Sequence, residues 1–270
     1  MYAVLATLTA LLLACRTLAL PSPHAPLVGS LPSLRLPRAD SGCRPSHTDF
    51  TSSLSDLYTV VEGEHAITHR GLEMFLDKPH GEVKMDKKTA TNDVVGTGTT
   101  VNSTYGLTHG KVTFEVSAPA VSGVVTAVIL VGLNKPAEMD VELLGGDPAH
   151  WQTNVFAPTA EDPRPLFGSF SSVEAVPGPE GLLAFHKYSI DWDAQRIVWA
   201  VDGREVRTLP RAKARKDGYE HYPQGEVRAQ LGIWDASSPA GTSEWARGPI
   251  EWDRTSSRIS AFVRSVTVEC

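Results

Sequence analysis

Three acidic residues alternate with apolar residues in the stretch EMDVELL, which covers residues 138–144. On an extended strand, residues i, i+2 and i+4 share one face, so we expect Glu138, Asp140 and Glu142 to project together. The apolar residues between and after these acids would face a core: Met139, Val141 and Leu143. A helix would spread the three acids over about 200° of arc, so the spacing favours a strand.

Acids placed in this way suit the hydrolysis of glycosides. A retaining mechanism needs two carboxyl groups roughly 5–5.5 Å apart, one acting as nucleophile and the other as general acid and then base. Four residues of strand separate Cα atoms by roughly 13 Å, so the side chains of Glu138 and Glu142 have to lean toward each other. A carboxyl group at Asp140 could then hydrogen-bond the nucleophile and help keep Glu142 protonated.

A solvated strand face is the alternative interpretation of these acids. Three charges of one sign on neighbouring positions repel one another, however, and Asp and Glu are poor strand formers. A sequence selected for stability alone would have included Thr or Lys at these positions. The spacing by itself therefore leaves a functional and a structural interpretation open.

Short strands are predicted along most of the chain. Turn residues separate them, as in DGR at 202–204, and residues 196–209 are predicted to form a hairpin with Asp202–Gly203 at its turn. No stretch has the periodicity of a helix longer than about two turns. The fold class that follows is all-β, an antiparallel sandwich or jelly roll, with strands predicted at 111–118, 124–133, 186–193, 196–203, 205–209, 227–234 and 259–269.

Composition and charge exclude several classes of protein. The 270 residues are 41% hydrophobic, which suits one large domain with its own core. The formal charge of −6 argues against a nucleic-acid scaffold, and the basic cluster RAKARK at 211–216 is interpreted as a solvated loop. The histidines form no ligand-spaced cluster and no phosphate-binding loop is found, so neither a metal nor a cofactor is predicted.

The N-terminal residues are typical of a secretory signal. Residues 3–14 form an apolar run as long as a signal-peptide core and too short to span a bilayer. Cleavage after Ala19 would leave residues 20–47 as a flexible Pro- and Ser-rich lead-in and residues 48–270 as the domain. A bacterial lipoprotein signal ending at Cys15 is the alternative. No later segment is apolar enough to cross a membrane, so the protein is predicted to be secreted, into the medium or the cell wall.

Two covalent modifications are compatible with secretion. Cys43 and Cys270 would remain after processing and could pair in an oxidising compartment, although the sequence does not decide whether they meet. NST at 102–104 makes Asn102 a candidate acceptor for N-glycosylation. Both features would be absent from most cytosolic enzymes.

The acidic stretch and the segments after it resemble glycoside hydrolase family 16, above all its fungal Crh-type cell-wall enzymes, which join chitin to β-glucan. EMDVELLGG followed by QTNVF resembles the ExDxE strand of that family and the strand after it. Two further segments resemble family blocks: FHKYSIDWDAQRIVWAVDGREVRTL and YPQGEVRAQLGIWDASSPAGTSEWARGPIEWD. The likeness covers residues 48–270; one departure is Ala137, where the family usually has Asp.

The resemblance implies a jelly roll of two curved sheets with a glycan cleft on the concave side. Glu138 would be the nucleophile, Asp140 the assisting carboxylate and Glu142 the acid/base. It also implies substrate-binding residues in the cleft: Gln152, Asn154, Trp234, Trp245, Tyr105 and Arg228. A plain sheet-edge pair remains the alternative for the two amides, and a core position for the two tryptophans. Trp192 and Trp199 are assigned to the core.

The predicted function is therefore that of a secreted retaining β-glycosidase or transglycosylase, acting as a monomer on cell-wall polysaccharide. The resemblance favours the transfer of chitin or β-glucan chains onto β-glucan acceptors. Two alternatives stay open: a plain endo-β-glucanase, and a lectin-like jelly roll that binds glycan without cutting it.

Overall fold

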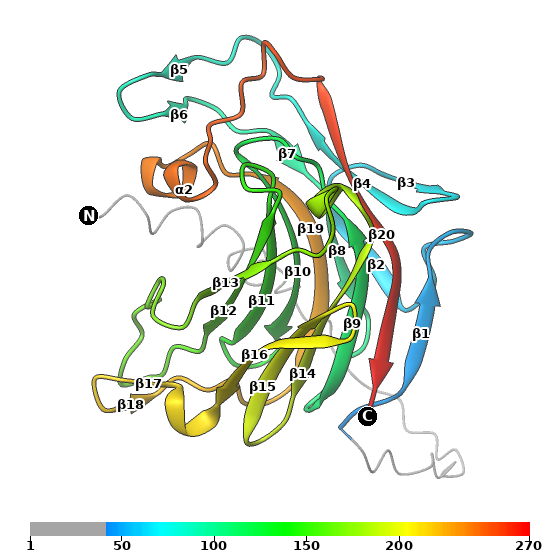
Figure 1. Cartoon of the computed structure of the whole chain (residues 1–270), viewed down its shortest axis with the longest axis vertical. Coiled ribbons are helices and arrows are strands. Elements are labelled where there is room, and N and C mark those ends of the chain that lie inside the picture. The colour runs from blue at the N-terminus through cyan, green and yellow to red at the C-terminus, as the bar shows by residue number, and fades with distance from the viewer. Residues whose placement is uncertain (1–41) are drawn as a thin grey trace, which may run out of the picture. The chain divides into compact units, whose positions relative to one another are not determined.

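Two antiparallel sheets make up residues 42–270, the part of the chain that the computed structural model describes (Figure 1). Sheet A follows the order β16 (Arg204–Pro210), β15 (Arg196–Val201), β14 (His186–Trp192), β9 (Gly110–Ser117), β20 (Arg258–Glu269), β4 (Gly71–Asp77) and β3 (His65–Thr68), with β1 (Ser46–Asp49) on β20 and β7 (Thr97–Gly98) on β4. Sheet B follows the order β13 (Ser172–Ala175), β12 (His150–Phe156), β11 (Glu138–Leu144), β10 (Val124–Gly132), β19 (Val227–Asp235), β8 (Thr100–Ser103) and β2 (Tyr58–Glu62). The predicted all-β jelly-roll sandwich is confirmed.

The core lies between the two sheets because each strand turns its apolar side inward. In β9, Val112, Phe114 and Val116 are fully buried and the residues between them face outward. The largest side chains buried with them include Trp151, Trp199, Tyr188, Leu130 and Met139. Burying a large apolar side chain contributes about 1.5–3 kcal/mol, so this alternation fixes which face of each strand is left for other uses. Trp192 and Trp199 are both in the core, as predicted.

Helical structure is sparse among the described residues. The α-helix is α2 (Ala240–Trp245), and two 3₁₀ turns cover Gly181–Leu183 and Arg211–Lys213. The predicted hairpin is confirmed as β15 and β16, with Asp202 at φ 49° and Gly203 at φ 78° in the turn. Two positive φ values are what a two-residue hairpin turn of the favoured hand requires.

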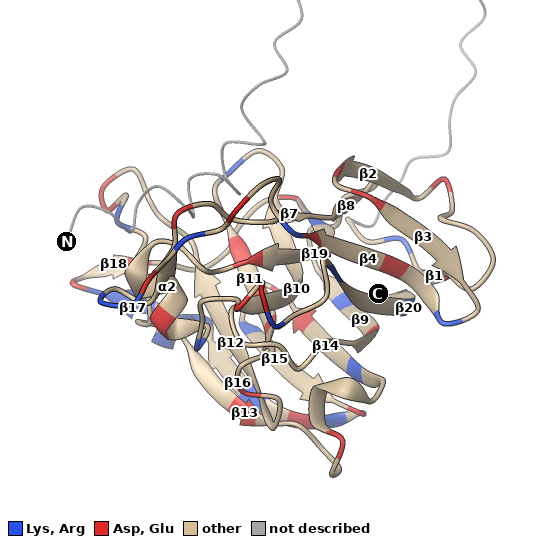
Figure 2. Ribbon diagram, turned by 90° about the horizontal axis from the view of Figure 1, so that it is seen from above, with Lys and Arg blue, Asp and Glu red and all other residues tan. Residues whose placement is uncertain are grey.

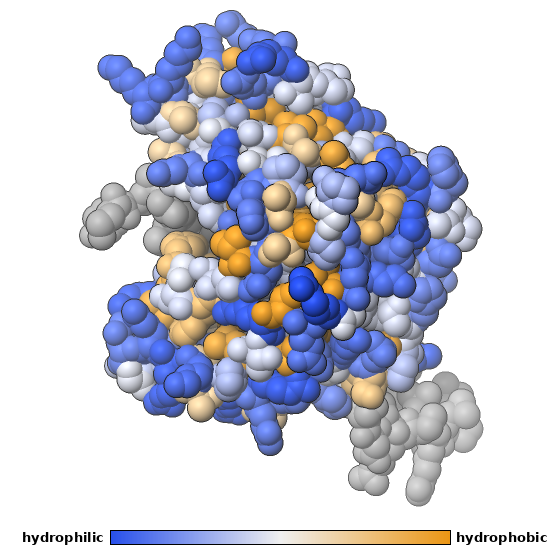
Figure 3. All heavy atoms as spheres, viewed as in Figure 1, coloured by the Kyte–Doolittle hydropathy of each residue, from blue (hydrophilic) through white to orange (hydrophobic). Residues whose placement is uncertain are grey.

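Sheet B bows, and its hollow side faces α2 and the small ladder of β17 (Arg215–Lys216) and β18 (Tyr219–Glu220) (Figure 1). Figure 3 shows the described surface indented on that side, between the end of the molecule that carries α2 and the end that carries β17 and β18. A second small ladder, β5 (Met85–Asp86) with β6 (Thr91–Asn92), lies beyond α2. We call the hollow side of sheet B the concave face.

The two ends of the described chain are joined. Cys43 and Cys270 form a disulfide with a Cα–Cα distance of 5.7 Å. The ordered domain also begins earlier than the predicted residue 48, because β1 already pairs with β20 from Ser46 onward. The compact unit starts at Gly42, so its first residues come from the predicted lead-in.

The predicted signal peptide 1–19, the lipoprotein alternative at Cys15 and most of the lead-in lie outside the described residues. Within residues 42–270, no helix has the length and hydropathy that a bilayer crossing demands.

Candidate active site

The three acids of β11 point together onto the concave face, as the alternation predicts. Met139, Val141 and Leu143 are buried in the core on the opposite side. The cross-strand neighbours on β10 and β12 share the face of the acids: Val131 and Phe156 flank Glu138, Ile129 and Asn154 flank Asp140, and Ala127 and Gln152 flank Glu142. β10 and β12, the strands on either side of β11, contain no Lys, Arg, Asp or Glu (Figure 2).

Burial and mutual repulsion hold protons on this row. Glu138 and Glu142 are half-buried, and Asp140 is fully buried. Burial and the nearby charge of Glu138 raise the pKa of Glu142 to about 8. Burial, the charges of both glutamates and a side-chain hydrogen bond with Glu138 raise the pKa of Asp140 well above its ordinary value. The same hydrogen bond opposes the effect of burial on the pKa of Glu138.

These shifts divide the three carboxyl groups between two roles. Asp140, on which burial and repulsion hold a proton, lowers the pKa of Glu138 against the effect of burial and so favours the ionised form of Glu138, which is the form a nucleophile needs. Glu142 keeps its proton at neutral pH and can deliver it as a general acid. Groups that interact this strongly titrate as a set, with apparent pKa values that belong to the set.

Gln152 meets two tryptophans beside the acids. Its Oε1 accepts a hydrogen bond of 2.9 Å from Nε1 of Trp245, at the end of α2. Trp234, on β19, stacks on Trp245 with ring centroids 6.0 Å apart and planes 20° apart. Both rings are partly exposed while their inner faces pack on a small apolar cluster that includes Val125 and Leu144. An amide and partly exposed indole faces next to Glu142 suit the two sides of a sugar ring.

Asn154 and Arg228 lie on the same concave face. Asn154 is beside Asp140, and its Oδ1 accepts a hydrogen bond of 2.9 Å from the backbone N–H of Val155. Arg228 is level with Glu138, with Val131 of β10 between them. The structure therefore gathers five of the six predicted binding residues around the acids.

Tyr105 is the exception, and its predicted place in the cleft was wrong. Its hydroxyl meets the hydroxyl of Tyr58 at 2.9 Å, and its ring packs edge-on against the same residue. Tyr58 is a buried core residue, so Tyr105 covers the edge of the core.

The structure also contradicts the prediction of a glycan on Asn102. This side chain is 3% exposed within β8, and its Oδ1 accepts a hydrogen bond of 2.7 Å from Nε2 of Gln230. An attached glycan needs its asparagine at the surface, so residue 102 is a structural amide in the folded protein.

Sequence reasoning missed three residues near the acids. Gln230 faces the cleft two residues after Arg228, a position that strand alternation could have indicated. Phe167 packs edge-on against Phe156 at 5.7 Å, but it comes from a loop without periodicity. Arg207 lies behind β11 on a core-facing position of its strand. Hydrophobic alternation does not predict an arginine at such a position.

A sandwich with paired carboxyl groups on one concave face has the parts that a retaining glycoside hydrolase requires. The chain belongs to glycosyl hydrolases family 16, whose family model matches residues 54–254.

Two fungal proteins are similar to most of this chain. Crh-like protein 5 of Aspergillus fumigatus is 30% identical over 225 residues, which cover 82% of this chain and 50% of the relative. Crh-like protein 1 of the same fungus is 29% identical over 254 residues, covering 89% of this chain and 63% of the relative. The chain thus spans about half to two thirds of the length of these two proteins. A solved Crh5 transglycosylase in complex with NAG is 28% identical, with a TM-score of 0.68 and 85% of each chain covered.

Proposed function

We propose that this protein is a retaining β-glycosidase that acts as a transglycosylase on cell-wall polysaccharide, outside the cell. The observation that carries the proposal is the pair Glu138 and Glu142 on one face of β11, with a proton held on Glu142 at neutral pH. Similarity to a Crh5 transglycosylase solved in complex with NAG supports transfer. The donor that we propose is chitin or β-glucan, and the acceptor is β-glucan.

The reaction runs in two displacements. The carboxylate of Glu138 attacks the anomeric carbon while Glu142 gives its proton to the departing glycosidic oxygen. The bond to the leaving sugar breaks as the bond to Glu138 forms, which leaves a covalent glycosyl-enzyme and an ionised Glu142. Glu142 then takes the proton of an acceptor hydroxyl, whose oxygen displaces Glu138 from the sugar. Both carboxyl groups return to their starting states.

Substrate is held by the residues around the acids. The exposed sides of Trp234 and Trp245 receive the C–H face of a pyranose ring, and Gln152, Asn154 and Arg228 reach its hydroxyl groups. Because Trp245 already hydrogen-bonds Gln152, the aromatic wall and the amide are set relative to each other before a sugar arrives.

Trapping with an activated fluorosugar tests the covalent step. We expect mass spectrometry of the digested protein to find one glycosyl adduct, on Glu138, and none after Glu138→Gln. Glu115→Gln, on sheet A, is the matched control and should label like the wild type. Binding of oligosaccharide without any adduct would support the lectin-like alternative and refute the proposal.

A second assay separates transfer from hydrolysis. The enzyme is incubated with chitin and a fluorescent β-glucan oligosaccharide, and the polymer is washed and counted. Label in the polymer is the result expected of a transglycosylase. Shortened chains and an unlabelled polymer would identify an endo-glucanase instead.

A further inference from the structure

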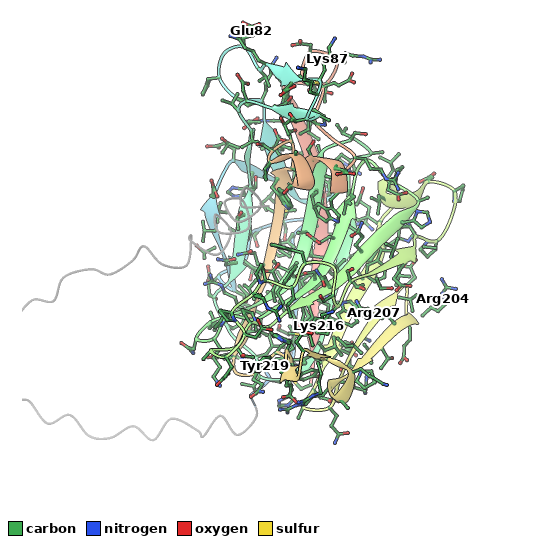
Figure 4. All side chains as sticks on the ribbon, turned by 90° about the vertical axis from the view of Figure 1, so that its left-hand side faces the viewer. Glu82, Lys87, Arg204, Arg207, Lys216 and Tyr219 are labelled. Carbon is green, nitrogen blue, oxygen red and sulfur yellow. A yellow bond between two sulfur atoms is a disulfide. The ribbon has the colours of Figure 1, made fainter. Side chains whose placement is uncertain are left out.

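One arginine lies between the sheets, directly behind the acidic strand. Arg207 is on β16 (labelled in Figure 4), across from Trp199 in the β15–β16 pair, and is half-buried. Its guanidinium carbon is 4.5 Å from the ring centroid of Trp199. Nη1 donates to Oγ1 of Thr153 at 2.5 Å, and Nη2 donates to the carbonyl oxygen of Phe170 at 2.5 Å. The guanidinium is therefore fixed on three sides.

The residues that contact Arg207 also contact or adjoin the strand that carries the acids. Trp199 is fully buried, and its Nε1 donates a hydrogen bond of 3.0 Å to the backbone carbonyl of Asp140. Thr153 is also fully buried and lies between the two cleft amides on β12, directly across from Val141. Arg207 thus holds the middle of β11 and the middle of β12 from the core side.

Charge adds a second connection. Within residues 42–270, no Lys, Arg or His forms an ion pair with Glu138, Asp140 or Glu142. The charge of Arg207 nevertheless reaches the row, because it lowers the pKa of Asp140 against the larger effects that raise it. Burial lowers the pKa of Arg207, and the charges of Glu174 and Asp140 oppose that effect.

The titratable groups around Asp140 come from several elements. On its own strand they are the two glutamates, and from β16 it is Arg207. Arg228 of β19 is level with Glu138, and Glu174 of β13 acts on Arg207. Arg207 is the cation for which an electrostatic effect on Asp140 is evident, and it acts from the side that substrate does not occupy.

We infer that Arg207 is a positioning residue for the reaction proposed above: through Trp199 and Thr153 it holds β11 and β12 in register behind the acids. From the same place its positive charge acts on Asp140. This inference rests on the proposed function. A core arginine that only fills space would stabilise the fold without changing how the acids titrate.

Arg207→Met and Arg207→Lys in the full chain test the inference through the pH profile of kcat/KM. Without the positive charge Asp140 ionises less readily, so we expect the acidic limb to move to higher pH in Arg207→Met. Arg207→Lys keeps the charge but loses the planar fork, so kcat should fall while the limb stays in place. Arg204→Met removes an exposed arginine from the same strand and is the matched control, with no change expected (Figure 4).

Loss of activity with an unmoved acidic limb in Arg207→Met would overturn the electrostatic part. If that variant does not fold, Trp199→Phe decides the positioning part. It removes the donor to the Asp140 carbonyl and changes no charge. We therefore expect kcat to fall, while KM and the acidic limb of the pH profile stay unchanged. An unchanged kcat would refute the inference.

A titration of the carboxyl groups, monitored by NMR, tests the role of Arg207 separately from the proposed function. Carbon-13 labelling of the Asp and Glu side chains reports the Asp140 titration in wild type and in Arg207→Met, without any substrate. If the wild type forms no glycosyl-enzyme, the proposed function fails, yet the titration of Asp140 still shows whether Arg207 acts on it. An identical titration in both proteins refutes the electrostatic role even in an active enzyme.

Discussion

Acids on the outer face of sheet A and acids on the concave face of sheet B differ in whether a cation lies beside them. On sheet A, Glu115 accepts a hydrogen bond of 2.7 Å from Nη1 of Arg264, and Glu269 lies 3.1 Å from Nζ of Lys111. These residues line an open polar groove of about 430 Å³. On sheet B, a row of three acids has no ion pair within the described residues, although one of them is fully buried.

The presence or absence of an ion-pair partner distinguishes acids that stabilise the fold from acids placed to exchange a proton. A carboxylate that contributes to stability is placed next to a cation, whereas a carboxylate that must hold or release a proton is buried beside other acids. In the groove on sheet A, Glu115 and Glu269 are therefore already neutralised. The row on β11 is the part of the molecule where burial and repulsion raise pKa values, and this costs folding free energy.

The largest effect is expected from Glu142→Gln. Removing the proposed general acid should lower kcat by about 10²–10⁴-fold, measured on glycosyl transfer at pH 6. Glu115→Gln, which removes an acid of sheet A, should leave kcat unchanged. Equal losses in the two variants would show that the two faces do not differ in the way described.

Removing the disulfide should act on stability alone. Cys43→Ser with Cys270→Ser is expected to lower the free energy of unfolding by about 2–4 kcal/mol, because the bond restricts the unfolded chain over 227 residues. Urea titration measures the loss, and kcat of the folded fraction should match the wild type. A lower kcat in fully folded protein would contradict the assignment of this bond to stability.

The pH dependence of stability should reveal the acids of sheet B. Glu142 in the folded protein keeps its proton up to about pH 8, whereas the unfolded chain releases it near 4.5. The folded state thus binds more protons in this window, so the free energy of unfolding falls as pH rises from about 4.5 to 8. One proton gives a slope of at most about 1.4 kcal/mol per pH unit. Glu142→Gln should flatten the curve; a wild type that gains stability relative to this variant as pH rises would oppose the idea.

Trp245→Ala tests the aromatic wall. Loss of a ring contact worth about 0.5–1.5 kcal/mol should raise KM for oligosaccharide by about 2–12-fold, with a smaller change in kcat. Trp245→Phe keeps an aromatic face but loses the donor to Gln152, so its KM should lie between that of the wild type and that of Trp245→Ala. Inhibition by non-hydrolysed oligosaccharide checks whether the change is in binding.

The smallest effect is expected from Glu115→Gln. Breaking its partly exposed ion pair with Arg264 should lower the free energy of unfolding by no more than about 1 kcal/mol, an effect that weakens further in 1 M salt. Chemical denaturation at low and high salt measures both values. A larger loss would mean that this face depends on its charges more than solvent-exposed pairs usually allow.

Local periodicity was enough to predict the long strands from residue 111 onward and the face that carries the acids, but not the strands between Ser46 and Ser103. Strict alternation leaves Glu138, Asp140 and Glu142 only one way to point once Met139 and its neighbours are buried. The hairpin at Asp202–Gly203 follows from turn chemistry in the same way.

Features set by distant contacts could not be predicted. Tyr105 lies in a short loop, so its direction depends on Tyr58, which is far away in sequence. Asn102 carries an acceptor motif, but its burial results from pairing with β19. Arg207 sits on a core-facing position that a pattern of hydrophobicity would reject, and only the packing of β16 against β12 explains it.

The bond between Cys43 and Cys270 also turns residues 43–270 into a covalent ring. A protease that cuts one surface loop of such a ring opens it without releasing a fragment. The disulfide keeps the two pieces of the nicked molecule covalently joined. They separate into two bands on a gel only after reduction, and until then the cut chain can keep both sheets paired.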